Sequence, residues 1–211
     1  DEASISDIQG VIKIFKIENG LAIVARSIWV AIKAGKRLKI TWDKGENDVL
    51  DSNKIKALLV EKSKKQGAIA RKKGNVKKAI KSSNNQVEAV YESPFQAHAT
   101  MEPMNCTADV QKNKCRIWAA TQAPARAQKK AAKITGLPIK KVELNVTYLG
   151  GGFGRRSIND FVNDAVEISM VMEKPVKMVW TREEDMQHDY YRPTSLHVMK
   201  GAIDDENHLT A

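Results

Sequence analysis

The chain has 211 residues, of which 42% are hydrophobic and 28% are charged, and this composition is typical of a folded globular protein. No apolar run approaches the roughly 20 residues of a transmembrane helix, and the first residues lack the pattern of a secretion signal, so we expect neither. Lys and Arg number 35 against 25 Asp and Glu, and the formal net charge of +10 makes nucleic acid or another anionic partner a hypothesis to test.

The N-terminal part predicts a small α+β unit. Val11–Ile17 and Leu21–Ala25 favour strands, and the Asn19-Gly20 pair between them is typical of a tight hairpin turn. A short apolar helix is expected over residues 28–34, because a serine suited to capping precedes it and Gly35 stands where a helix terminator would.

Two further elements are expected before the chain changes character. Residues 38–42 predict a strand, and Ser52 is expected to begin a helix. The four tryptophans of the chain all lie in apolar stretches, so we expect them in the core: Trp29, Trp42, Trp118 and Trp180.

The positive charge is concentrated in one segment. Between Lys54 and Lys81 there are eleven basic residues and one acidic residue, Glu61, so the rest of the chain is formally neutral. A site for single-stranded nucleic acid would use aromatic side chains to stack bases, and there is no Phe, Tyr or Trp between Asp43 and Gln86. We therefore interpret the segment as a solvated lysine-rich helix and connector, with a nucleic-acid patch as the alternative.

The two cysteines are expected to be free thiols. Residues 106–119 predict a hairpin that sets Cys115 opposite Val110 and Cys106 opposite Ala119. At that register the two sulfur atoms would lie about 13 Å apart, which is too far for a disulfide. The pair also lacks the spacing of a metal site.

The second half of the chain shows dense strand and helix patterns. Pro124 predicts the start of a helix that ends at Gly136, residues 142–148 alternate as in a half-buried strand, and residues 158–169 have helical spacing. Thr181–Glu184 has the sequence of a capping box. Further strands are expected at residues 86–91, 176–180 and 196–203, and residues 209–211 begin a return strand.

A glycine-rich stretch, Gly150-Gly151-Gly152-Phe153-Gly154-Arg155-Arg156, separates the strand at 142–148 from the next helix. Glycines let backbone N–H groups approach a ligand, a helix N-terminus favours anions, and the two arginines can contact a phosphate bidentately. The stretch matches neither the phosphate loop of nucleotide triphosphatases nor the dinucleotide fingerprint. The residues alone leave two alternatives: a site for a phosphorylated cofactor or nucleotide, and a tight turn without a ligand.

Four stretches together carry a family resemblance: His98–Asn105, Trp118–Gln122, Gly150–Arg156 and Thr181–Pro193. In their order and separations they resemble the molybdenum-binding large subunit of the xanthine oxidase and aldehyde oxidase family. Within that family the chain is most similar to the branch of the isoquinoline 1-oxidoreductase beta subunit and the membrane-associated aldehyde dehydrogenases.

The resemblance implies an α+β fold in three parts. Residues 1–60 are expected to form a partial aldehyde-oxidase-type α/β hammerhead domain, residues 61–85 a basic connector, and residues 86–211 the first part of a molybdopterin-binding domain. Because the last expected strand is interrupted, we interpret the chain as a fragment of a longer polypeptide.

The resemblance also implies a cofactor and partners. The cofactor would be molybdopterin, in its cytosine dinucleotide form, with molybdenum held by the pterin rather than by protein side chains. Family enzymes oxidise N-heteroaromatic or aldehyde substrates with oxygen from water and pass electrons to iron–sulfur centres. The expected partners are a small [2Fe-2S] subunit, a cytochrome c subunit in some members, and a small-molecule substrate; nucleic acid is not expected. Both a cytoplasmic and a periplasmic location agree with the sequence.

By motif position, Gln122 matches the glutamine that contacts the molybdenum oxo group and the pterin. Gly152, Phe153 and Gly154 match the loop whose backbone approaches the apical ligand of the metal. With their neighbours they make up the predicted set of cofactor-binding residues: Gln122, Gly151, Gly152, Phe153, Gly154 and Arg155.

The chain also departs from the family pattern. Arg156-Ser157 replaces the Lys-Glu of xanthine-type members, which argues against a purine substrate. The family's catalytic base is a glutamate in a Gly-Glu pair far along the chain, and the only such pair here, Gly45-Glu46, lies in the wrong part. We therefore assign no catalytic residue and no metal ligand, and we expect the isolated fragment to be inactive and to bind the cofactor weakly or not at all.

Other polar residues have competing interpretations. His98 could line a substrate entrance, but an ordered loop held by Pro103 is the favoured interpretation. The neighbours His188 and Asp189 could suggest a proton relay, although no nucleophile accompanies them. The acidic residues 183–185 are interpreted as favourable charges at a helix N-terminus. The function alternative to a molybdenum enzyme is a non-catalytic binding module with a basic, nucleic-acid-binding segment.

Overall fold

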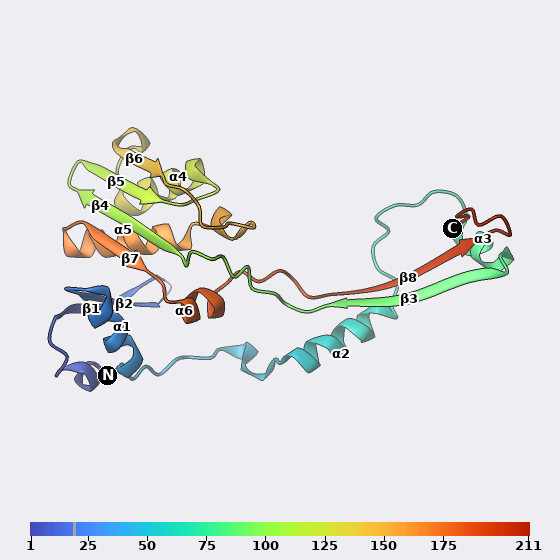
Figure 1. Ribbon diagram of the computed structural model, residues 1–211, viewed down its shortest axis with the longest axis horizontal. Coiled ribbons are helices and arrows are strands. Elements are labelled where there is room, and N and C mark those ends of the chain that lie inside the picture. The colour runs from blue at the N-terminus through green and yellow to red at the C-terminus, as the bar shows by residue number, and fades with distance from the viewer. Residues whose placement is uncertain (19) are drawn as a thin grey trace. The chain divides into compact units, whose positions relative to one another are not determined.

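The computed structural model describes residues 1–18 and 20–211 and shows an α+β protein, as predicted (Figure 1). Contacts divide the chain into two compact units, each made from two separate stretches. Unit 1 comprises residues 1–42 and 97–191, and unit 2 comprises residues 43–96 and 192–211. The domain boundaries expected from the sequence stay a prediction, because compact units need not coincide with family domains. No helix in the described part of the chain is long and apolar enough to span a membrane.

Unit 1 contains a four-stranded mixed sheet in the order β6-β5-β4-β7. Its strands and main helices are β4 (Asn105–Gln111), β5 (Lys114–Ala119), α4 (Pro124–Thr135), β6 (Val142–Val146), α5 (Asp160–Met172), β7 (Val176–Val179) and α6 (Arg182–Gln187). Short 3-10 helices lie at Ile139–Lys141 and Arg155–Ser157. The β4–β5 pairing is antiparallel and the β5–β6 pairing is parallel, as expected when α4 forms the crossover.

The core of unit 1 lies between the sheet and the helices α4 and α5, which also pack against each other (Figure 1). Alternating strand residues and the small residues of α4 fill it. The predicted register is confirmed, since Cys115 pairs with Val110 and Cys106 with Ala119, and both thiols are free and buried. Burial raises the pKa of Cys115 to about 11 and that of Cys106 still further.

The N-terminal stretch of unit 1 forms a 3-10 helix at Glu2–Ile5, a hairpin of β1 (Val11–Ile17) and β2 (Gly20–Ala25), and α1 (Ile28–Arg37). The two strands pair antiparallel as predicted, while Asn19 of the expected Asn19-Gly20 turn lies outside the described residues. Ile5, Ile8 and Ala34 form a second small core here.

Three expectations for this stretch are wrong. The helix continues through Gly35, which faces Ile23 of β2 and keeps a negative φ, so the glycine is not a terminator. Residues 38–42 are not a strand, because backbone groups of Lys39 bond to the N-terminal residues instead. Trp29 and Trp42 are 79% and 62% exposed rather than buried in the core. Trp118 and Trp180 are partly buried.

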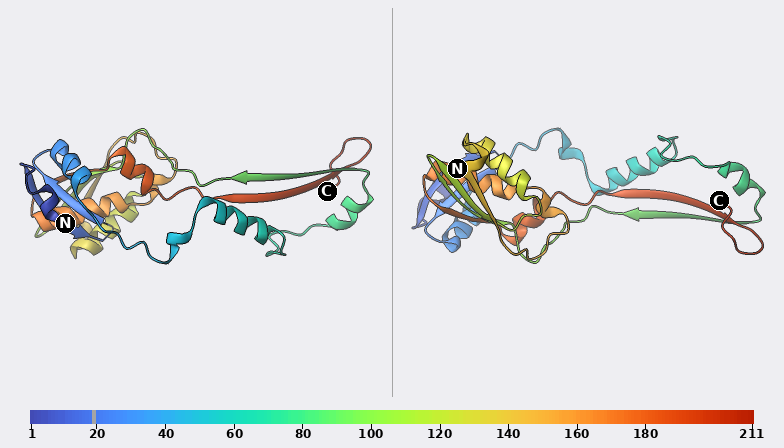
Figure 2. Two further views of the ribbon diagram at one scale, coloured as in Figure 1. Left: turned by 90° about the horizontal axis from the view of Figure 1, so that it is seen from below. Right: turned by 90° about the horizontal axis from the view of Figure 1, so that it is seen from above.

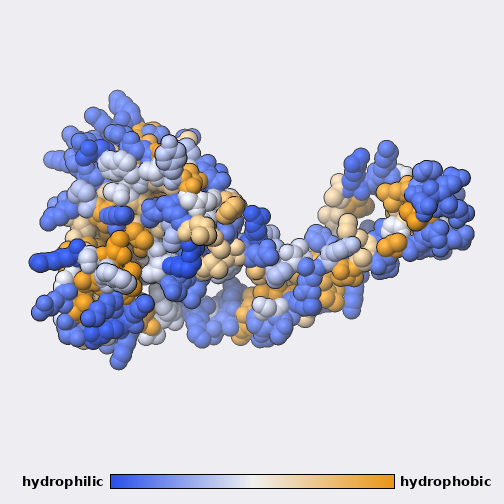
Figure 3. Space-filling view, viewed as in Figure 1, coloured by the Kyte–Doolittle hydropathy of each residue, from blue (hydrophilic) through white to orange (hydrophobic). Residues whose placement is uncertain are grey.

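Unit 2 is built around a long two-stranded antiparallel ladder. Its elements are a 3-10 helix at Glu46–Val49, α2 (Ser52–Ser63), α3 (Val76–Ser82), β3 (Asn85–Ser93) and β8 (Ser195–Ile203). The strands pair over their full length, from Asn85–Ile203 to Ser93–Ser195, and lie side by side in all three ribbon views (Figures 1 and 2). The expected return strand forms a bridge between Ile203 and Leu209. Figure 3 shows apolar side chains on the surface over this ladder.

Candidate functional site

The glycine-rich stretch Gly150–Arg156, hereafter the glycine loop, has a constrained backbone. Gly151 and Gly154 have φ values of +98° and +99°, where only glycine is comfortable, and Phe153 has a φ of +52°. The last two residues of the loop belong to the short 3-10 helix Arg155–Ser157, and α5 begins only after the cap residue Asn159. The N-terminus of α5 therefore does not follow the loop directly, unlike in the anion site considered from the sequence.

Gln122 lies directly against this loop. The backbone N–H of Gly154 donates to Gln122 Oε1 at 3.1 Å, and the Gln122 N–H donates to the Arg156 carbonyl at 3.0 Å. A Cβ on Gly152 would stand 2.6 Å from Gln122 Oε1, so no other residue fits there without moving the amide. The structure thus brings together predicted site residues from two motifs that lie about thirty positions apart.

Glu102 holds the start of the glycine loop. Its carboxylate accepts from the Gly150 N–H at 2.9 Å, and its own N–H donates to the Gly150 carbonyl at 3.0 Å. A Cβ on Gly150 would lie 2.4 Å from the Cβ of Glu102, which requires glycine at this position. Burial raises the pKa of Glu102, but hydrogen bonds from Asn105 and Gly150 and the charge of Arg156 outweigh burial, so the pKa lies below its usual value.

Arg156 is fully buried and ties two other segments to the loop. Its guanidinium donates to the Gly151 carbonyl at 2.8 Å, the Ala120 carbonyl at 3.2 Å and the Glu102 carboxylate at 2.8 Å. Burial lowers its pKa, and the charges of Glu102 and Asp185 oppose that effect. Because all of these partners belong to the protein, Arg156 fixes the shape of the loop.

Arg155 is also buried, and its guanidinium points to different partners. It donates to both carboxylate oxygens of Asp160 at 3.0 and 2.8 Å, and its Nε lies 2.9 Å from Asp189 Oδ1 as an ion pair rather than an aligned hydrogen bond. The rings of Trp180 and Tyr190 lie 5.5 and 5.4 Å from the guanidinium carbon, within cation–π range. The predicted contact of Arg155 with a cofactor stays a prediction, and the structure gives its guanidinium protein partners.

A His98–Asp189 pair was not anticipated from the sequence. Nδ1 of His98 lies 3.0 Å from both carboxylate oxygens of Asp189, and the His98 backbone N–H also donates to this carboxylate. The adjacent His188, considered as a partner of Asp189, instead stacks edge-on against Trp180, with 5.2 Å between ring centroids. No local sequence signal could have found this pair, because its members lie 91 positions apart.

The capping box expected at Thr181–Glu184 forms after β7, and the acidic residues 183–185 lie in the first turn of α6, where they were expected. Thr181 accepts from the Glu184 N–H, and the Glu184 carboxylate accepts from the Thr181 N–H, which completes the capping box of α6. Burial raises the pKa of Asp185, and its ion pair with Arg182 at 3.0 Å partly opposes this. Arg182 in turn donates to the carbonyls of Thr100 and Met101, next to the glycine loop's partner Glu102.

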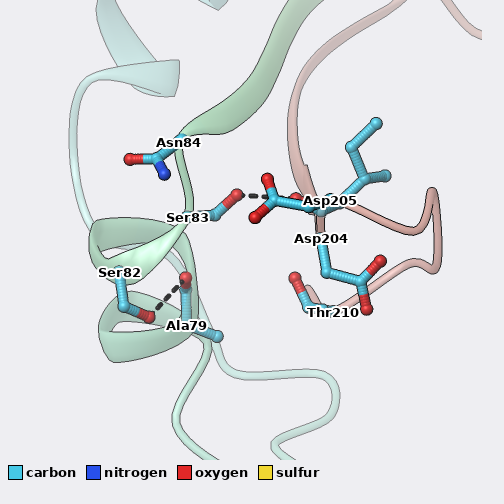
Figure 4. A pocket seen from close by; sticks show the side chains of 8 residues that line it. Ala79, Ser82, Ser83, Asn84, Asp204, Asp205 and Thr210 are labelled. Atoms are coloured by element: carbon cyan, nitrogen blue, oxygen red, sulfur yellow. Dashed lines mark hydrogen bonds between the residues drawn. The ribbon is translucent and has the colours of Figure 1, made fainter.

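A separate pocket of about 210 Å³ lies in unit 2, between the end of α3 and the turn after β8 (Figure 4). The hydroxyl groups of its lining bond to the protein backbone, because Ser82 donates to the Ala79 carbonyl and Ser83 to the Ile203 carbonyl. Thr210 likewise donates to Ala202. The glycine loop is therefore the stronger candidate site. Constrained glycines, a side-chain amide and buried ion pairs lie together there.

The sequence profile of one family, described as the molybdopterin cofactor-binding domain, matches residues 60–211. Among curated proteins, the chain is 30% identical over 198 residues to the membrane-bound aldehyde dehydrogenase [pyrroloquinoline-quinone] of Gluconacetobacter polyoxogenes, covering 92% of this chain and 26% of the relative. It is 29% identical to the isoquinoline 1-oxidoreductase beta subunit of Brevundimonas diminuta, and the match covers 91% of this chain and 26% of the relative. It is 26% identical to a nicotinate dehydrogenase subunit of Pseudomonas putida, and the match covers 88% of this chain and 16% of the relative. The chain thus spans about a quarter or less of these relatives.

Solved structures share the fold. The quinoline 2-oxidoreductase from Pseudomonas putida 86 superposes with a TM-score of 0.68 at 16% identity, covering 99% of this chain and 32% of that one. The Cu,Mo-CO dehydrogenase gives a TM-score of 0.68 at 18% identity, covering 99% and 33%. At these identities the likeness shows the architecture and says nothing of the substrate.

Proposed function

The chain belongs to the molybdopterin cofactor-binding domain family, and from that premise we propose that it is part of the large subunit of a molybdenum-dependent oxidoreductase. In the proposal, residues 1–60 supply part of a hammerhead domain and residues 86–211 the first part of the cofactor-binding domain. The substrate class is an N-heteroaromatic compound or an aldehyde. Names of curated relatives in both classes support this choice.

The arrangement of Gln122 against Gly152 and Gly154 carries the proposal. Within residues 1–18 and 20–211, the Gln122 amide nitrogen and the N–H groups of Gly151 and Gly152 make no hydrogen bond to the protein. These donors, on a loop whose glycines permit close approach, fit a group rich in oxygen acceptors. We assign the contact to molybdopterin, in its cytosine dinucleotide form, through Gln122, Gly151, Gly152, Phe153, Gly154 and Arg155.

When bound, the cofactor supplies the two-electron oxidation chemistry, with oxygen taken from water. The chain's own residues orient it: Gln122 donates from its amide, and the clamp of Glu102 and Arg156 keeps the glycine loop in the required shape. Electrons would leave to a [2Fe-2S] partner subunit, and to a cytochrome c subunit where one is present. We assign no residue of this chain as the base that prepares the water-derived oxygen for attack on the substrate carbon, and we expect the isolated chain to hold the cofactor weakly.

The test is to purify the protein from its native host with its partners and to measure molybdenum, pterin and turnover of isoquinoline, nicotinate and a simple aldehyde. We expect stoichiometric molybdenum and turnover of one substrate class. Gln122→Ala is expected to lower the molybdenum content, while Gln111→Ala, a glutamine at the far end of β4, should leave it unchanged. A native preparation without molybdenum would refute the proposal, and stoichiometric molybdenum in the isolated 211-residue chain would refute the expected weak binding.

A further inference from the structure

His98 presents one free ring nitrogen to the glycine loop. Its Nε2 lies 3.9 Å from the point where a Cβ on Gly154 would stand, so the edge of the ring faces this residue. Among residues 1–18 and 20–211, Nε2 has no hydrogen-bond partner. The side chain is only 11% exposed, which means that the nitrogen is held in a sheltered position beside the loop.

The opposite ring nitrogen is fixed by a buried carboxylate. The side chain of Asp189 is 2% exposed, and each of its carboxylate oxygens lies 3.0 Å from His98 Nδ1. A carboxylate accepts hydrogen bonds and does not donate them, so a neutral His98 must carry its proton on Nδ1. Nε2 then bears the lone pair and faces the loop as a hydrogen-bond acceptor.

The surroundings hold this pair in place. Arg155 joins Asp189 to Asp160 at the start of α5, while the Trp180 and Tyr190 rings cover its guanidinium. Other nearby charges include the Asp185–Arg182 pair of α6 and the guanidinium of Arg156. Arg155, which is flanked by the two carboxylates, limits the movement of Asp189. A fixed carboxylate is what an imidazole needs to accept a second proton without leaving an unbalanced positive charge.

Backbone strain marks the same place. Ala99, which follows His98, has a φ of +47°, and Phe153, which precedes Gly154, has a φ of +52°. A left-handed conformation is unfavourable for non-glycine residues and persists where the surrounding structure enforces it. Ala99 and Phe153 are thus both strained next to the point where His98 approaches Gly154, which indicates that the surrounding structure enforces this approach.

From this geometry we propose that His98 Nε2 accepts a proton from the O–H or N–H group that the hydroxylated product carries, with the product held on the Gly154 side of the loop. The Nε2 lone pair forms the new N–H bond, the donor keeps its electron pair, and the imidazolium is balanced by Asp189. Asp189 and Arg155 are positioning residues that act through His98. This inference rests on the proposed function for its substrate, but the histidine's protonation state is testable without it.

The first experiment uses nitrogen NMR of the 211-residue chain labelled at its histidines. The chain has four histidines, so single substitutions assign every signal. We expect neutral His98 to carry its proton on Nδ1, and Asp189→Asn to weaken that preference. The signals of His197 and His208, whose ring nitrogens lie near Ser195 and Asp204 instead, should not respond to Asp189→Asn. A proton on Nε2 of neutral wild-type His98 would overturn the inference.

The second experiment uses the holoenzyme and the variants His98→Ala, His98→Gln and, as a matched control, the exposed His197→Gln. Loss of a positioned proton acceptor typically costs 100-fold or more in rate. We expect kcat per bound molybdenum to fall roughly 100-fold in His98→Ala and His98→Gln, with KM changed far less and His197→Gln equal to wild type. Gln keeps a polar group at this position but cannot take up a proton, so full activity in His98→Gln would overturn the inference.

The outcomes separate the two proposals. Wild-type holoenzyme without molybdenum or turnover would defeat the proposed function, and the NMR result would still decide the state of His98. An active wild type whose His98 variants lose molybdenum but keep their turnover per molybdenum would leave the proposed function standing. It would show that His98 is only structural, which would overturn the inference.

Discussion

The two units of the molecule are stabilised in different ways. Unit 1 buries large apolar side chains such as Phe161 and Ile117 completely, and its glycine loop is held by buried arginines. In unit 2, Ala202 is the buried hydrophobic residue among the described positions, and side chains such as Val87 and Val90 are more than 60% exposed. Unit 2 therefore depends on the backbone ladder between β3 and β8 and on contacts of α2 and α3 with β8.

This difference explains why the candidate site lies where it does. A site must hold its groups within a fraction of an ångström, which requires neighbours that cannot relax. The well-packed sheet of unit 1 supplies them, because β5 and β6 lead directly to the segments that carry Gln122 and the glycine loop. The two-stranded ladder of unit 2 offers no comparable support, since an isolated two-stranded sheet is marginally stable by itself.

The largest expected effect comes from the core of unit 1. Phe161 in α5 is 0% exposed, and Phe161→Ala should lower the free energy of unfolding of unit 1 by about 3–5 kcal/mol through lost burial and the cavity left behind. Hydrogen exchange resolved by segment would show faster exchange across β4, β5 and α5. Val90→Ala in β3 is the control, since Val90 is 61% exposed and its truncation should leave exchange in unit 1 unchanged.

Buried and exposed ion pairs provide a second contrast. The Arg155 and Asp160 side chains are 1% and 4% exposed, and Asp160→Asn should destabilise unit 1 by about 3 kcal/mol, because it leaves a buried guanidinium with Asp189 as its remaining carboxylate. Lys200 and Glu88 of unit 2 are both 54% exposed, and Glu88→Gln should have no measurable effect on urea unfolding. Equal effects of the two substitutions would contradict the difference between the units.

A smaller effect is expected from the glycine that meets Glu102. Gly150→Ala places a Cβ 2.4 Å from the Glu102 Cβ, so the backbone must shift, at a cost of about 1–3 kcal/mol measured by thermal or urea unfolding. Gly67→Ala is the matched control in unit 2, because its Cβ would meet nothing within 4 Å. If Gly150→Ala were as stable as Gly67→Ala, the tight contact between loop and clamp would be disproved.

Local interactions account for what the sequence could predict. The hairpin with Cys115 opposite Val110, the helix from Pro124 and the Thr181 capping box each depend on residues close together in the chain, and the structure confirms them. Trp29 was misplaced because only its apolar neighbours in the sequence were considered; at helical spacing it shares a face of α1 with Lys33 and Lys36, away from the buried Ala34.

The long-range contacts of the site could not be predicted in the same way. Arg156 bonds to Glu102 across 54 positions, and His98 bonds to Asp189 across 91. Two adjacent arginines after a glycine loop suggest an anion site when only the sequence is seen. Packing instead directs both side chains inward, Arg155 to Asp189 and Arg156 to Glu102.

The smallest expected effect concerns the basic segment, which has nine Lys and Arg and no acidic residue between positions 62 and 81. Changing Lys72, Lys73, Lys77 and Lys78 to Gln lowers the formal net charge from +10 to +6. Because these side chains are exposed, the free energy of unfolding should change by less than about 0.5 kcal/mol. Binding of generic duplex DNA should be equally weak in wild type and variant at roughly 150 mM salt, about the physiological ionic strength. Strong, salt-dependent binding by the wild type that the variant loses would instead favour a nucleic-acid-binding role for unit 2.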